Sequence, residues 1–172
     1  MVTKKIQYHD LDGDLREDEF YFSMNETQFA RANSMFPGGL QAFAMKAAKD
    51  KNGDDMFRVI DTLVRESYGE FVNNRFVKTA PNGQKLSDFF INTEAYDNLL
   101  TELMQNEDNL MAFLTACLNK SAQERVKGKW TKFKEDGGDM AALEKLQDEV
   151  AQEAAQAVKA EQKPSLSVLN KN

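Results

Sequence analysis

The sequence is poor in the residues that build most catalytic and metal centres. Its 172 residues include one Cys and one His. A single Cys excludes an internal disulfide and a cysteine zinc site, and suits a reducing compartment. A nucleophile, a base and an orienting group cannot be assembled from so few candidates. We therefore expect no enzymatic activity, no cofactor and no metal.

Long apolar runs and an excess of positive charge are also missing. No stretch nears the roughly 18 apolar residues of a membrane span, and the start, MVTKKIQYHD, has no apolar run of signal-peptide length. The formal net charge of −6 argues against general binding to nucleic acid or to an anionic membrane. We expect a cytoplasmic protein without nucleic-acid or membrane partners.

The densest apolar pattern lies between residues 86 and 118, where large apolar residues recur at spacings of three and four, the period of a helix. Thr93 and Asn106 provide side-chain oxygens that can cap two helix starts. The pattern predicts helices near 94–105 and 107–119. It also predicts a core that contains Phe89, Leu100, Leu103 and Phe113.

Residues 3 to 22 alternate apolar and polar around Asp12-Gly13-Asp14, which predicts a β-hairpin. A three-residue loop at 12–14 would set Ile6 opposite Phe20 and keep Tyr8 and Phe22 on the same face. A lone hairpin is marginal in water, so this apolar face is expected to lie on the helices or to pair with another chain.

The acidic turn has part of the pattern of a calcium loop. Positions 1, 3 and 5 of an EF-hand-like loop are filled by Asp10, Asp12 and Asp14. However, Leu15 stands where the loop needs Gly, and Tyr21 where it needs a bidentate Glu, which favours a solvated turn. His9 has no second His or Cys partner, so we expect a solvent-facing strand residue.

The middle of the chain predicts three helices. Asn25 and Gln28 fit a capping box at the start of the first helix. Asn52-Gly53 is expected to close the second helix, and Gly69 to cap the third. The inner stripe of the third helix would include Phe57. The expected ranges are 26–36, 39–49 and 54–68. Residues 70–85 predict a loop in which short strands can pair, with a turn at 81–83.

The composition changes after residue 120. Residues 124–134 carry five basic residues, and basic residues interleaved with aromatics can indicate nucleic-acid binding. Here the apolar residues share one helix face, which favours an amphipathic helix packed on the core or on a partner. A second helix, 139–162, has only a thin apolar stripe. We predict partner-binding residues in this extension: Trp130, Phe133, Leu143, Leu146 and Val150.

Together these elements predict a mainly α fold, a helical domain with an N-terminal β-hairpin and a C-terminal helical extension. The expected divisions are 1–120 for the domain, 121–163 for the extension and 164–172 for a disordered tail.

Several short motifs, in this order and spacing, resemble the tail assembly chaperones of long-tailed bacteriophages with siphovirus morphology. The resemblance spans roughly residues 6 to 118 and rests most on Thr93-Glu94-Ala95-Tyr96, followed by Leu99-Leu100 and Glu102-Leu103. It includes the Asp-Gly hairpin before Glu19-Phe20-Tyr21-Phe22, the helix end Ser67-Tyr68-Gly69, and Phe76-Val77-Lys78 ahead of Leu86-Ser87-Asp88-Phe89.

The resemblance implies a non-enzymatic assembly factor that binds the tape measure protein, keeps it soluble and promotes assembly of the tail tube around it. It also implies a host bacterial cytoplasm, absence from the mature virion, and a frameshifted longer product that recruits the tail tube protein. A thin stripe at 139–162 would suit self-association. The alternative is another small phage or prophage protein with a helical core and a structural or regulatory interaction role.

Overall fold

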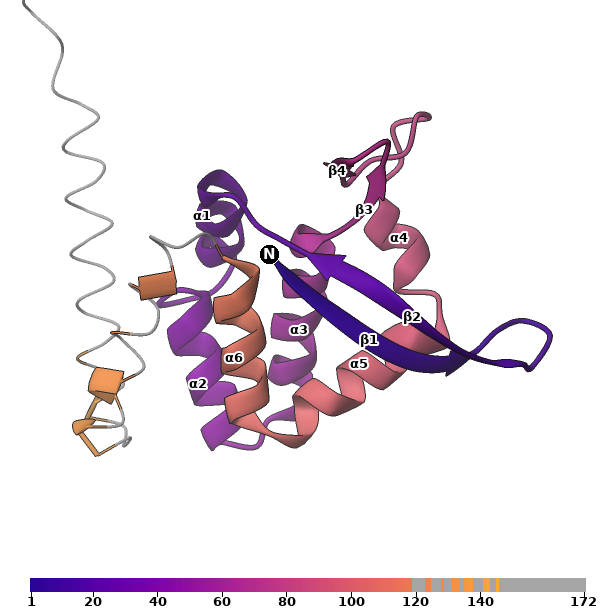
Figure 1. Cartoon of the computed structure of the whole chain (residues 1–172). Coiled ribbons are helices and arrows are strands. Elements are labelled where there is room, and N and C mark those ends of the chain that lie inside the picture. Colours follow the sequence, from indigo (N-terminus) through magenta and orange to yellow (C-terminus); the bar gives the residue numbers. More distant parts are fainter. Residues whose placement is uncertain are drawn as a thin grey trace, which may run out of the picture.

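The computed structural model describes residues 1–118 and, beyond them, residues 123–124, 128, 131–133, 135–137, 141–142 and 145. A four-stranded antiparallel sheet in the order β1-β2-β3-β4 accompanies the helices (Figure 1). The elements are β1 (Val2–His9), β2 (Leu15–Phe22), α1 (Glu26–Ser34), α2 (Leu40–Lys49), α3 (Gly53–Ser67), β3 (Tyr68–Val72), β4 (Arg75–Val77), α4 (Leu86–Phe90), α5 (Glu94–Gln105) and α6 (Glu107–Cys117).

The fold is therefore mixed α/β, and the expectation of a mainly α fold with a single hairpin is corrected. The reason is the second hairpin, β3–β4, which pairs with β2 at Tyr21–Gly69 and Phe22–Tyr68. Its turn residues, Asn73 and Asn74, both have positive φ, as a two-residue hairpin of the I′ type requires. The strand pairing expected within 70–85 is confirmed.

The first hairpin has the predicted faces but a different register. His9 pairs with Leu15, so the loop is residues 10–14, and Ile6 opposes Asp18 instead of Phe20. The Asp10 carboxylate organises this longer loop, because it accepts hydrogen bonds from the amides of Asp12 and Asp14 and from Arg16. The guanidinium of Arg16 also holds the pKa of Asp10 below its usual value.

The predicted helix starts are confirmed at three caps. Asn25 and Gln28 form a reciprocal capping box, and the side chains of Thr93 and Asn106 accept amide hydrogen bonds at the starts of α5 and α6. The break between α2 and α3 differs from the prediction. Lys51 takes the left-handed conformation, and Asn52 caps α3, which begins at Gly53.

The third helix also ends one residue earlier than predicted, because Tyr68 and Gly69 already belong to β3. Gly69 is needed there for close packing. A Cβ at this position would lie 2.5 Å from the carbonyl oxygen of Val77 and 2.7 Å from the ring of Phe76. The glycine thus allows β3 and β4 to approach, instead of capping a helix.

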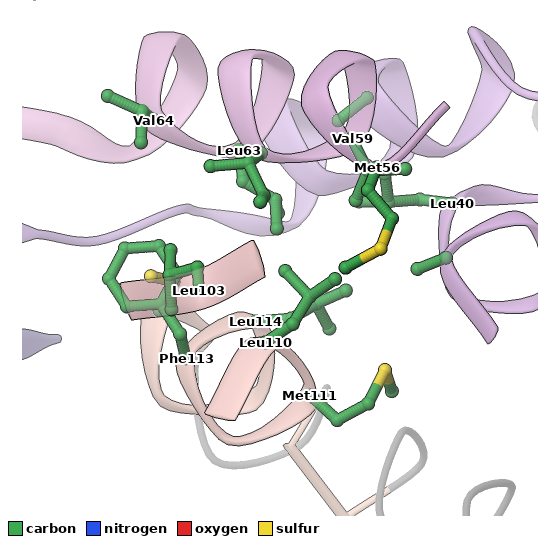
Figure 2. Close-up of a cluster of buried hydrophobic side chains, with 14 of the residues drawn as sticks. Leu40, Met56, Val59, Leu63, Val64, Leu103, Leu110, Met111, Phe113 and Leu114 are labelled. Carbon is green, nitrogen blue, oxygen red and sulfur yellow. The ribbon is translucent and has the colours of Figure 1, made fainter. Parts of the chain in front are cut away.

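The core lies where α3 meets α5 and α6, with α2 alongside (Figure 2). Leu103 and Phe113 are buried as predicted, and Leu100 is partly buried and packed against the core cluster. The prediction for Phe89 is wrong, since its side chain is 50% exposed, and so is that for Phe57, which is 44% exposed. In each helix the neighbouring residue is buried instead, Phe90 in α4 and Met56 in α3.

Three side chains of α5, spaced four residues apart, cover the outer edge of β1. Glu102 pairs with Lys4, Asn98 donates to the carbonyl oxygen of Gln7 at 2.8 Å, and Glu94 lies 2.9 Å from His9 Nδ1. His9 is solvent-exposed, as predicted. This row of contacts protects a strand edge that would otherwise be free to pair with another chain.

Candidate interaction surface

Three aromatic rings gather on the outer face of the sheet, the face turned away from the core. Tyr21 and Phe71 meet edge to face with ring centroids 5.1 Å apart, and Phe76 lies 5.7 Å from Phe71. We call these three residues the outer-face aromatic cluster. Because strand side chains alternate between faces, Phe20 and Phe22 point the other way and join the core.

The cluster reaches solvent through the β3–β4 hairpin, which projects from the body of the protein (Figure 1). Phe71 is 46% exposed, and its neighbour Val72, on the other face of β3, is 50% exposed. The turn at Asn73–Asn74 follows them directly and brings Phe76 back opposite Phe71. Neighbouring exposed apolar side chains of this kind are typical of protein-interaction surfaces.

Lys78 fixes the base of this hairpin to two helices. Its ammonium group donates to the carbonyl oxygens of Ser23 and Glu66 and to the amide oxygen of Gln28, 2.8 Å away. These bonds use its three donors. Burial lowers the pKa of Lys78 from 10.5 to about 8, and the nearby Glu66 carboxylate opposes that shift.

The carboxylate of Glu66 is itself buried and lies between two cations. Arg31 donates to one of its oxygens, and the Lys85 ammonium lies 3.6 Å from the other. An open hollow next to this network is lined by Ser23, Asn25, Gln28, Phe76 and Lys78. Since the Lys78 donors are already occupied, we assign the network to holding β4, α1 and α3 together.

The sequence-predicted partner residues fall mostly outside the described part of the chain. Trp130, Leu143, Leu146 and Val150 are among the residues that the structure does not describe. Phe133 is 7% exposed and packs in the main core cluster. The partner-binding role of all five residues stays a prediction.

Sequence reasoning missed the outer-face aromatic cluster. The signal was present: Phe71-Val72 and Arg75-Phe76-Val77 are two short β-prone runs, separated by two asparagines that tolerate positive φ. Within the described residues, no group of three or more His, Cys, Asp or Glu side chains is placed to hold a metal ion. No described helix is both long and apolar enough to cross a membrane.

Residues 1–171 match the family model described as "Phage tail assembly chaperone". The chain belongs to this family. The match extends beyond the part, residues 6 to 118, on which the motif resemblance rests. No curated protein and no solved structure matches the chain.

Membership of this family gives the general role. A phage tail assembly chaperone is an assembly factor that interacts with tail proteins and is not part of the virion. Chaperone families are generally non-enzymatic. The functional site expected of such a protein is therefore a surface that binds another protein.

Proposed function

We propose that this protein binds the tape measure protein of its phage, keeps it soluble, and promotes assembly of the tail tube around it. The observation that carries the proposal is the family match over residues 1–171. A tape measure protein is a long helical chain, and its apolar stripes would aggregate without a partner to cover them.

The outer-face aromatic cluster is the surface that we assign to this contact. An amphipathic helix binds by placing apolar side chains in an apolar surface, and aromatic anchors contribute most to such contacts. Phe71 offers exposed apolar area, and Tyr21 adds a ring with a polar tip.

The remaining parts of the role are proposals that follow from the family. The protein acts in the host bacterial cytoplasm. A frameshifted longer product recruits the tail tube protein, and the extension contributes further contacts and self-association through Trp130, Phe133, Leu143, Leu146 and Val150.

Co-purification tests the proposal. The tape measure protein, carrying an affinity tag, is expressed together with this chain, and the retained chain is quantified. We expect the wild type to be retained and Phe71→Ser to be retained at least 10-fold less. Phe57→Ser is the matched control, because Phe57 has nearly the same exposure on a different element.

Circular dichroism of each variant confirms that the fold is intact. If the wild-type chain is not retained, the proposed function is wrong. If both serine variants are retained like the wild type, the function stands and the outer-face aromatic cluster is the wrong surface.

A further inference from the structure

The edge of β2 opposite β1 is open over most of its length. β3 pairs with β2 only at Tyr21 and Phe22 and then turns away with β4 (Figure 1). Across the part of the chain that the structure describes, no strand lies beside residues 15–20 on that side. All but Phe20 of these residues are exposed, including Leu15 at 65%.

The hydrogen-bond pattern identifies which backbone groups face this open edge. Along an antiparallel strand, one residue bonds its partner through its backbone amide and carbonyl, and the next directs these two groups away from the partner strand. The Asp10 amide bonds the Asp14 carbonyl, which places Arg16 and Asp18 among the residues bonded to β1. The outward groups are therefore the amides and carbonyls of Leu15, Glu17 and Glu19.

Two contacts on other edges agree with this assignment. Ser23 lies an even number of residues from Leu15, Glu17 and Glu19, so its backbone should face the same side. Its amide donates to the Ser67 carbonyl on the β3 side. On β1, the outward carbonyl of Gln7 is the one that accepts from Asn98. The β1 edge is thus covered by α5, whereas the described residues supply no hydrogen-bond partner to the backbone amides and carbonyls of Leu15, Glu17 and Glu19 on the open side of β2.

The charge along the open edge is strongly negative. Glu17 and Glu19 lie on the outer face, with Asp18 between them on the other face, and three aspartates lie in the loop before β2, at positions 10, 12 and 14. Among the cations nearby, Arg16 is paired with Asp10, and Lys5 lies 3.8 Å from Glu19.

This charge disfavours pairing with a second copy of the chain. An antiparallel pair of two β2 edges centred on Glu17 would set Glu17 against Glu17 and Glu19 against Leu15. Centring on Asp18 would set Glu17 against Glu19. Like charges directly opposite each other destabilise a sheet. Two copies of this edge are therefore not expected to pair, whereas a strand of opposite charge can add to it.

We propose that the open edge of β2, through the backbone of Leu15, Glu17 and Glu19, binds an extended segment of another protein with Lys or Arg at alternate positions. The segment adds a strand to the sheet, its backbone bonds to the outward amides and carbonyls, and its basic side chains lie against Glu17 and Glu19. This binding mode goes beyond the proposed tape measure contact and uses other residues.

The test uses the full-length chain, labelled with ¹⁵N, and a synthetic peptide, acetyl-TKTKTKT-amide. We expect amide shifts to concentrate at Leu15, Glu17 and Glu19, and to exceed those of Arg16 and Asp18. The acidic peptide acetyl-TETETET-amide should cause at least 10-fold smaller shifts at equal concentration. Raising the salt to 0.5 M should weaken binding, because exposed charges are screened.

Variants separate the backbone from the charge. Glu17→Pro removes an amide that faces the open edge and leaves the pairing with β1 intact, so it should abolish binding while Glu17→Gln only weakens it. The double variant with Glu17→Lys and Glu19→Lys should bind the basic peptide with at least 10-fold lower affinity. Glu124→Lys with Glu135→Lys is the charge-matched control on exposed residues outside the sheet.

Two results would overturn the inference. One is equal binding of the basic and acidic peptides. The other is unchanged binding of the basic peptide to Glu17→Gln with Glu19→Gln while that variant self-associates, because the carboxylates would then serve only to keep copies of the chain apart.

Discussion

At the residue scale, side chains of similar type take opposite roles according to the face of the helix on which they lie. Leu103 and Phe113 are buried where α3, α5 and α6 meet (Figure 2). Phe89 lies on the solvent side of α4. Stability should therefore respond to substitutions at these positions very differently.

We expect Leu103→Ala and Phe113→Ala each to lower the free energy of unfolding by about 2 to 5 kcal/mol, because each leaves a cavity in a close-packed core. Phe89→Ala should change it by less than about 1 kcal/mol, as is usual for an exposed site. Urea denaturation measures all three values. A loss at Phe89 as large as at Phe113 would contradict the assignment of Phe89 to the surface.

At the scale of elements, Lys78 ties β4 to α1 and to the end of α3. Lys78→Met would leave the carbonyl oxygens of Ser23 and Glu66 without this donor, at a cost of about 1 to 3 kcal/mol near neutral pH.

The pH dependence of stability has a defined sign. The pKa of Lys78 is about 8 in the folded protein and 10.5 as the ordinary value. Between these values the unfolded chain binds more protons, so stability rises with pH above about 8, and this contribution is lost as the pH falls through 8. Relative to Lys78→Met, the wild type should gain stability from pH 8 to about 9.5, below the range of ordinary tyrosine titration.

Urea denaturation at several pH values measures this difference. Lys46→Met is the matched control, since Lys46 is exposed on α2, and its profile should follow that of the wild type. Parallel profiles for Lys78→Met and the wild type would contradict the assigned shift.

The elements also show which features the sequence could predict. Helix starts depend on one side chain and the next few amides, so Asn25, Thr93 and Asn106 could be identified from local chemistry. The faces of the first hairpin followed from the alternation of apolar and polar residues. The loop length did not, because it depends on hydrogen bonds to the Asp10 carboxylate, which the apolar pattern does not reveal.

Features that depend on packing between distant segments were harder to predict. Which face of α3 and α4 turns inward depends on α5, α6 and the sheet, and this placed Phe57 and Phe89 wrongly. The outer-face aromatic cluster needs β2 beside β3, which the sequence does not specify. Strands as short as β4, residues 75–77, give too little alternation for a firm prediction.

At the scale of the whole molecule, the family match covers residues 1–171. The last helix whose bounds the structure defines, α6, ends at Cys117. Phe133 and Ala142 both belong to the buried cluster. A chain ending at Asp136 would keep Phe133 and lose Ala142.

We expect this truncated chain to fold, with stability lowered by only about 1 kcal/mol, because among the described residues beyond Asp136 the truncation removes one buried side chain, the methyl group of Ala142. It should bind the tape measure protein more weakly or self-associate differently, since the predicted contacts at Leu143, Leu146 and Val150 are gone. Calorimetry and analytical ultracentrifugation, with the co-purification assay, measure these effects. Unfolding, or unchanged binding and association, would contradict the predicted role of residues 139–162.

We propose that this chain keeps the tape measure protein soluble by binding it. The most direct measurement is the soluble fraction of the tape measure protein in bacterial cells, expressed alone, with the wild-type chain, or with Phe71→Ser. We predict an aggregated tape measure protein when it is alone, a mostly soluble one with the wild type, and a substantial loss of solubility with Phe71→Ser. A soluble fraction that is the same with and without the wild-type chain would contradict the claim.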